Sequence, residues 1–144
     1  MKTITGRGGL PLVRIETPWS AAEIYLHGAS VTHFQLHGEP PLLFLSEKSR
    51  FEKDAPIRGG IPIIFPWFGP HPSDPKKGQH GFARSTDWKV ESKSDNEIAL
   101  RLEASDATRA ATIVPSIADS QIRRFMADSP GATCWPRVCG LRGP

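Results

Sequence analysis

The chain has 144 residues, of which 38% are hydrophobic and 23% charged, and its formal net charge is +3. This length fits one ordinary domain, and the positive charges are scattered rather than gathered, which argues against a nucleic-acid surface. No segment is apolar enough to span a membrane, and residues 1–5 lack the apolar core of a secretory signal, so we expect a cytoplasmic protein with no membrane partner.

Three segments near the start of the chain alternate between apolar and polar residues. They cover residues 10–17, 21–27 and 31–37, with glycines between or after them at positions 28 and 38. A period of two over such lengths predicts β-strands. In the third segment the pattern places Val31 and His33 on one face, together with Gln35 and His37, and Phe34 on the other face.

The middle of the chain contains short apolar runs and a polar loop. Residues 41–45 and 61–65 are consistent with buried strand segments or a rigid extended wall, although Pro62 and Pro66 favour an edge or irregular position. Residues 70–78 form a proline-rich polar loop. Segments 87–92 and 97–103 then predict a hairpin, and the whole pattern predicts an all-β sandwich.

The last part of the sequence differs in composition. Residues 110–144 contain no Lys, Glu, His, Asn or Tyr, whereas the preceding part uses all five. We therefore divide the chain into a β-sandwich portion, residues 1–109, and an atypical tail, residues 110–144, which a shifted reading frame or a truncated gene would explain. Cys134 and Cys139 lack the cysteine or histidine partners of a zinc site, so no metal site is expected there. A disulfide between them stays open, although the expected compartment argues against it.

Two motifs carry the chemistry. The first reads RGGIPIIFPWFG at residues 58–69, and the second reads GQHGFAR at residues 78–84. Arg58 opens a Gly-Gly pair, where the missing Cβ atoms let a ligand approach the backbone closely. Arg84 adds a second guanidinium, and His80 is a side chain able to hydrogen-bond or transfer a proton. The combination indicates a cleft for a polar, anionic small molecule.

These motifs resemble the aldose 1-epimerase (mutarotase) superfamily, and most closely the glucose-6-phosphate 1-epimerases. Weaker support comes from the LHGA segment at residues 26–29, from residues 41–46 and from Trp88, and the likeness covers about residues 8–109. The resemblance implies the N-terminal half of a galactose-mutarotase-like antiparallel β-sandwich (a supersandwich), here truncated. It also implies interconversion of the anomers of a hexose 6-phosphate without a cofactor.

The resemblance also implies roles for single residues. Arg58 and Arg84 would contact the sugar phosphate, and Gln79 and His80 would line the sugar site. The family's principal acid, a histidine, and its base, a glutamate, lie beyond the matching region. Residues 110–144 contain neither type. His80 is then the candidate catalytic residue that remains, and we expect impaired catalysis.

Several alternatives stay open at this stage. His80 could be a satisfied buried histidine, and some of the aromatic residues at positions 65, 67, 68 and 82 could pack in the core instead of stacking on a sugar. His33 and His37 share a predicted strand face, which a solvated surface explains better than a metal site. The chain could also be a non-catalytic sugar-phosphate binding module, or a fragment without function.

Overall fold

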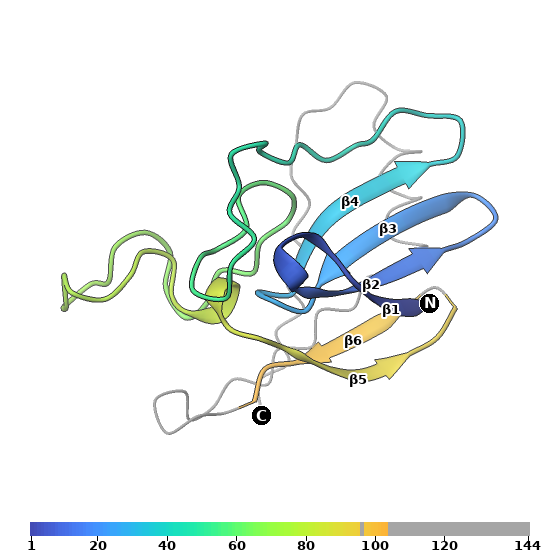
Figure 1. Ribbon diagram of the computed structural model, residues 1–144. Coiled ribbons are helices and arrows are strands. Elements are labelled where there is room, and N and C mark those ends of the chain that lie inside the picture. Colours follow the sequence, from blue (N-terminus) through green and yellow to red (C-terminus); the bar gives the residue numbers. More distant parts are fainter. Residues whose placement is uncertain (96, 104–144) are drawn as a thin grey trace, which may run out of the picture.

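The computed structural model describes residues 1–95 and 97–103 of the chain, and these residues form β-structure with two short 3-10 turns. Four antiparallel strands build the first sheet in the order β1-β2-β3-β4 (Figure 1). Their bounds are Lys2–Thr5, Pro11–Glu16, Ser20–Tyr25 and Ser30–Leu36. The three strands predicted from alternation are confirmed. The sequence did not predict β1, because all four of its residues are exposed and no apolar face marks it.

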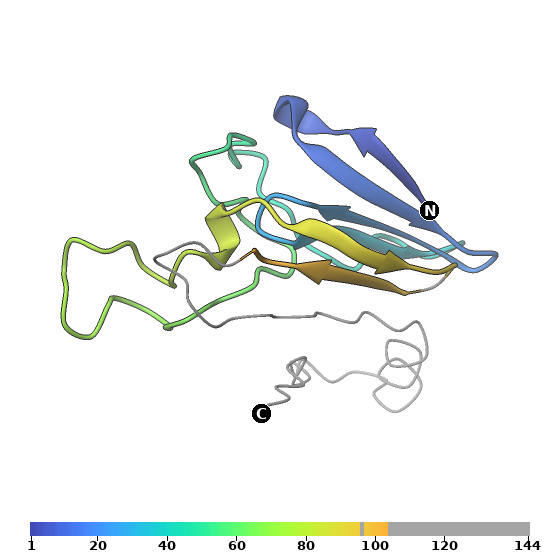
Figure 2. The same ribbon diagram turned by 90° about the horizontal axis from the view of Figure 1, so that it is seen from below.

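A separate hairpin follows the long connection after β4. Strands β5, Lys89–Lys93, and β6, Ile98–Arg101, pair antiparallel, so the predicted hairpin is confirmed. Just before it lies the 3-10 turn η2, Ala83–Ser85, and the turn η1, Arg7–Gly9, joins β1 to β2. The two sheets can be followed from below in Figure 2. In both views the green connection before η2 extends beyond one end of the sheets.

The larger core cluster joins the two sheets. It combines residues of the first sheet, Val13, Ile15, Ile24 and Val31, with residues in and around the hairpin, Trp88, Ile98, Leu100 and Leu102. These side chains are at most 7% exposed. Burial of such side chains is the main stabilising term for a sandwich, worth about 1.5–3 kcal/mol for each large one. The structure thus bears out an all-β antiparallel fold.

A smaller cluster covers part of the other face of the first sheet. Leu12 and Tyr25, which are register partners on β2 and β3, pack there with Leu10, Phe51 and Ile57. The Tyr25 and Phe51 rings lie 5.1 Å apart between centroids. This cluster anchors the segment that leads to Arg58.

One predicted face assignment is wrong, because β4 contains a bulge. The register of β3 and β4 shifts between Glu23 and Ile24: Glu23 pairs with His33, whereas Ile24 pairs with Val31. Val31 consequently lies in the larger core, while His33 lies on the opposite face beside Glu23. A bulge inserts one extra residue into a strand, and a strict period of two cannot anticipate it.

The apolar runs at residues 41–45 and 61–65 form no strand of their own. They make isolated bridges instead, Leu45 with Gly59, Val31 with Ile61 and Phe65 with Gly81. Leu42 and Phe44 are 52% and 79% exposed, so the first run is not buried as a whole. The irregular position favoured by Pro62 and Pro66 is the one observed.

The predicted tail, residues 110–144, lies outside the described residues, and so does the boundary proposed at residue 109. Among the residues that the structure describes, no helix has the length and apolar character needed to cross a membrane.

Candidate functional site

The first motif is fixed between two other segments of the protein. Gly60 N–H donates to the Phe44 carbonyl (N···O 2.7 Å), and Ile61 exchanges two backbone hydrogen bonds with Val31 (3.2 and 2.8 Å). A Cβ on Gly59 would lie 2.6 Å from the Phe44 oxygen, and one on Gly60 would lie 2.1 Å from the Val31 oxygen. The space beside these two glycines, which the sequence analysis assigned to a ligand, is therefore occupied by the protein's own backbone. These contacts fix the backbone at Arg58.

The second motif is held against the first by hydrogen bonds along its length. Phe82 N–H and Ala83 N–H both donate to the Phe65 carbonyl (3.0 and 3.3 Å). Gly81 has φ +70°, and a Cβ there would lie 1.8 Å from the Phe65 oxygen, so only glycine fits. The two motifs, separated in the sequence by the polar loop, therefore form a single unit.

His80 is fixed through both its backbone and its ring. Its N–H donates to the Gly69 carbonyl (2.7 Å), and its ring Nδ1 accepts the Gly69 N–H (3.0 Å). A nitrogen that accepts an N–H carries no proton, so in the neutral ring the proton is on Nε2. The backbone of His80 is in the left-handed region (φ +65°), which is uncommon for a residue with a side chain. His80 therefore presents one fixed N–H donor.

The two arginines of the motifs lie near each other. The pKa of Arg84 is lowered from its ordinary value, first because the side chain is partly buried and second because the positive charge of Arg58 is close. Arg84 Nη2 donates to the backbone carbonyl of Gln79 (2.8 Å). Within the described residues the ion pairs of arginine and lysine involve other side chains, and neither Arg58 nor Arg84 pairs with a carboxylate.

The structure thus brings Arg58 near Arg84, and Arg84 in turn contacts the backbone of Gln79, the residue before His80. Gln79 is exposed and contributes its backbone carbonyl to Arg84. Two neighbouring cations without an acidic partner repel each other, and an anion between them would relieve this repulsion. The arrangement can hold a phosphate or carboxylate.

Three of the four aromatic residues of the motifs, Phe65, Phe68 and Phe82, are of two kinds. Phe65 and Phe82 meet edge to face, with centroids 6.1 Å apart, and pack against the larger core. Phe68 is 82% exposed, and its ring lies edge-on to that of His80 (4.9 Å between centroids). Phe68 is therefore the aromatic residue best placed to contact a ligand near His80.

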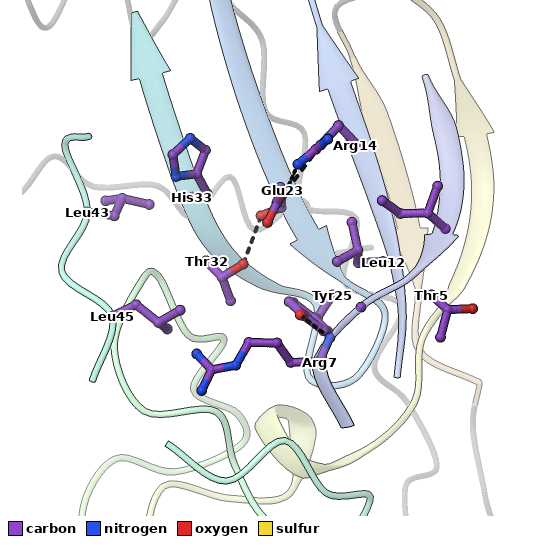
Figure 3. Close-up of a pocket in the computed structure, with 12 residues that line it drawn as sticks. Thr5, Arg7, Leu12, Arg14, Glu23, Tyr25, Thr32, His33, Leu43 and Leu45 are labelled. Atoms are coloured by element: carbon purple, nitrogen blue, oxygen red, sulfur yellow. Dashed lines mark hydrogen bonds and ion pairs between the residues drawn. The ribbon is translucent and has the colours of Figure 1, made fainter. Parts of the chain in front are cut away.

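An open cavity of about 450 Å³ lies elsewhere, on the face of the first sheet that carries Arg14 and Glu23 (Figure 3). Arg14 Nε donates to Glu23 Oε1 (3.1 Å), and the Arg7 guanidinium lies 4.3 Å above the centre of the Phe51 ring. These charged groups already have partners, and none of the four predicted site residues lines the cavity. We do not place the functional site there.

One of the two histidines on the predicted strand face, His37, contacts the protein's own backbone. His37 Nε2 donates to the Thr17 carbonyl (3.0 Å), which leaves that nitrogen unable to ligate a metal. In residues 1–95 and 97–103 no group of three or more His, Cys, Asp or Glu side chains could hold an ion. Sequence reasoning missed a different histidine contact, His27 with Asp87, because 60 residues separate the two in the chain.

Comparisons with known proteins agree with the motifs. The family model described as aldose 1-epimerase matches residues 11–115. A Salmonella typhimurium protein provisionally named glucose-6-phosphate 1-epimerase is 36% identical over 104 residues, covering 69% of this chain and 35% of that protein. An Escherichia coli protein of the same provisional name is 34% identical over 96 residues, covering 65% of this chain and 32% of its own length.

Solved structures show the same fold. A Salmonella typhimurium protein provisionally described as a mutarotase has a TM-score of 0.66 and 30% identity, covering 76% of this chain and 40% of its own. A Synechocystis protein has a TM-score of 0.58 and 30% identity, covering 73% of this chain and 42% of its own. The chain spans about a third of the length of the two curated relatives described above.

Proposed function

Because the chain belongs to the aldose 1-epimerase family, we propose that its ligand is a hexose 6-phosphate whose phosphate lies between Arg58 and Arg84. One observation carries this proposal: two neighbouring guanidiniums, neither paired with a carboxylate in the described part of the chain. Guanidinium groups bind phosphate through paired, charge-assisted hydrogen bonds. The provisional names of the two bacterial relatives support the same substrate class.

The reaction proposed for the family is a proton-transfer cycle. A base removes the proton from the O1 hydroxyl, an acid protonates the ring oxygen, and the bond between C1 and the ring oxygen breaks. Rotation about C1–C2 and closure by the reverse transfers give the other anomer. Positioned acids and bases contribute about 10²–10⁴-fold each to such a reaction, and no cofactor takes part.

His80 is the residue we assign to the proton-donor side of this chemistry. Its Nε2–H can donate to a sugar oxygen, and its ring cannot turn without losing the hydrogen bond from Gly69 to Nδ1. Gln79, the neighbouring residue, is exposed and free to contact a sugar hydroxyl through its amide. Together they would orient the sugar while the arginines hold its phosphate.

The 144-residue chain taken by itself is expected to bind better than it catalyses. The family resemblance places the principal acid and base beyond the two motifs, and residues 110–144 contain no His and no Glu. A second candidate function, a non-catalytic sugar-phosphate binding module, is favoured by the same facts and by the use of His80 Nδ1 as a backbone acceptor.

A calorimetric titration with glucose 6-phosphate and with glucose, combined with NMR of anomer exchange on the same samples, tests the proposal. We expect glucose 6-phosphate to bind at least about tenfold more tightly than glucose, because a neutral sugar leaves the arginines without an anion. Faster exchange would identify an epimerase, and binding without faster exchange a binding module. Equal affinities would contradict the phosphate assignment. A non-cooperative melt without binding would indicate a fragment without function.

A further inference from the structure

His27 lies in the turn between β3 and β4 and is completely buried, with an exposed fraction of 0%. Both of its ring nitrogens nevertheless have partners. Nδ1 lies 2.9 Å from Asp87 Oδ1, and Nε2 lies 3.1 Å from the Ala55 carbonyl oxygen. A buried imidazole between a carboxylate and a backbone carbonyl is a specific arrangement, and nothing in the proposed reaction uses it.

Each of the two residues that contact His27 lies three positions along the sequence from one of the two arginines. Ala55 precedes Arg58 by three residues, and Asp87 follows Arg84 by three residues. Backbone contacts reinforce the second connection: His27 and Asp87 form a bridge, flanked by hydrogen bonds from Gly28 N–H to the Thr86 carbonyl (2.8 Å) and from Trp88 N–H to the Leu26 carbonyl (2.9 Å). One side chain therefore links both arginine-bearing segments to the same strand turn.

We propose that His27, through its contacts with Ala55 and Asp87, is a positioning residue that sets the separation of Arg58 and Arg84. This inference rests on the proposed function, since it deepens the account of the phosphate site. Two guanidiniums that repel each other do not stay close unless the backbone holds them there.

The hydrogen-bond partners define the form of the ring that this role needs. A carboxylate and a carbonyl are both acceptors, whereas a neutral imidazole carries only one N–H. Only the doubly protonated ring donates to both partners. Its charge would be balanced by Asp87, whose side chain is 60% exposed and still in contact with water. A buried cation needs such a paired charge, so an amide at position 87 would not replace the carboxylate.

The test compares the wild-type chain with three variants at two exposed carboxylates. Asp87→Asn removes the charge that faces His27, and Asp87→Glu keeps it. Asp54→Asn is the matched control, because Asp54 is exposed, adjoins Ala55 and makes no hydrogen bond or ion pair within the described residues. Each is titrated with inorganic phosphate and with glucose 6-phosphate, its melting is recorded, and the ring N–H signals of His27 are observed by nitrogen-15 NMR.

We expect two ring N–H signals for His27 in the wild type and in Asp54→Asn, and one in Asp87→Asn. Affinity for both anions should fall roughly three- to tenfold in Asp87→Asn, with a cooperative melt retained, and should recover in part in Asp87→Glu. Unchanged anion affinity in a folded Asp87→Asn variant would overturn the positioning role, as would a single ring N–H in the wild type. Absence of anion binding by the wild type would instead contradict the proposed phosphate site.

The second measurement needs no ligand, and so tests the inference if the phosphate site fails. Hydrogen exchange is followed at the amides of residues 57–61 and 82–86 in the same variants. Asp87→Asn should increase exchange in both segments relative to Asp54→Asn, because His27 connects them. Faster exchange confined to the segment beside Asp87 would overturn the inference.

Discussion

Charged side chains are paired differently on the two sheets and in the two joined motifs. On the sheets, oppositely charged side chains face each other in pairs: Arg14 with Glu23 on β2 and β3, and Arg101 with Glu91 on the hairpin. In the motifs, Arg58 and Arg84 lie near each other, and neither has a carboxylate partner among the described residues. A folded protein tolerates such like charges where a ligand supplies the counter-charge, so the difference distinguishes the scaffold from the site that we propose.

The backbone of the motifs differs from that of the strands. The strands follow ordinary extended geometry, whereas positive φ values lie in the connections. Around the first sheet they occur at Gly8, Gly9, Gly28, Ala29 and Gly38, and in the motifs at Gly59, Gly60, Gly69, His80 and Gly81. Strained or glycine-dependent backbone persists where surrounding contacts hold it and where a particular geometry is needed. The proposed site therefore lies on loops that are fixed by hydrogen bonds, and the following changes test how far these bonds determine its geometry.

The largest effect is expected from Gly81→Ala. The new Cβ would lie 1.8 Å from the Phe65 oxygen, and the residue would keep a φ of +70°. We expect a loss of about 3 kcal/mol or more in the free energy of unfolding, measured by urea denaturation, together with loss of phosphate affinity. Gly78→Ala is the control, because a Cβ there meets nothing within 4 Å. A Gly81→Ala chain as stable as Gly78→Ala would show that the two motifs are not joined as described.

Removing either site arginine should affect binding strongly and folding little. Arg58→Ala and Arg84→Ala are each expected to weaken the binding of glucose 6-phosphate by about 10- to 100-fold in calorimetry, since each would remove charge-assisted hydrogen bonds to the phosphate in the proposed site. Arg50→Ala removes the same charge from an exposed side chain that faces Glu52 at 3.6 Å, and should change affinity less than about twofold. Equal losses in all three variants would mean that only net charge matters.

The scaffold side of the comparison can be tested through Tyr25, the only tyrosine of the chain. Burial raises the pKa of its hydroxyl above the ordinary value, opposed in part by the hydrogen bond from Arg7 N–H (2.9 Å). The neutral phenol therefore contributes stability that is complete below about pH 10, the unfolded pKa, and is lost as the pH rises through the folded-state pKa.

Ultraviolet titration of the phenolate measures this directly, because no other tyrosine contributes. We expect a midpoint above pH 10 in the folded chain and near pH 10 in urea. Tyr25→Phe should abolish the alkaline loss of stability, and should cost about 1 kcal/mol at neutral pH by leaving Arg7 N–H without its acceptor. Coinciding midpoints in the folded and unfolded chains would place the hydroxyl in water.

The sequence predicted the regular part of this molecule well and the site only in outline. Alternation located β2, β3, β4 and the hairpin, because each places an apolar face on a core. The bulge in β4 and the exposed strand β1 leave no such signal. The motifs indicated Arg58, Gln79, His80 and Arg84 as candidates. The contacts between their atoms depend on hydrogen bonds that join the two motifs across the loop of residues 70–78, and the sequence does not show these bonds. His27 and Asp87, 60 residues apart, meet only after folding.

The smallest effects are expected from the alanine variants of two exposed phenylalanines, Phe68 and Phe44. Phe68 and Phe44 are 82% and 79% exposed, and only Phe68 makes a ring contact among the described residues, with His80. Both alanine variants should lose less than about 0.5 kcal/mol of stability, because little apolar area is buried. Phe68→Ala should weaken the binding of glucose 6-phosphate about two- to fivefold if the ring contacts the sugar, and should leave the affinity for inorganic phosphate unchanged. Equally weakened binding of both ligands would instead mean that Phe68 supports the positions of His80 and Arg84. The segment that carries Phe68 would then stabilise the proposed site without contacting the sugar.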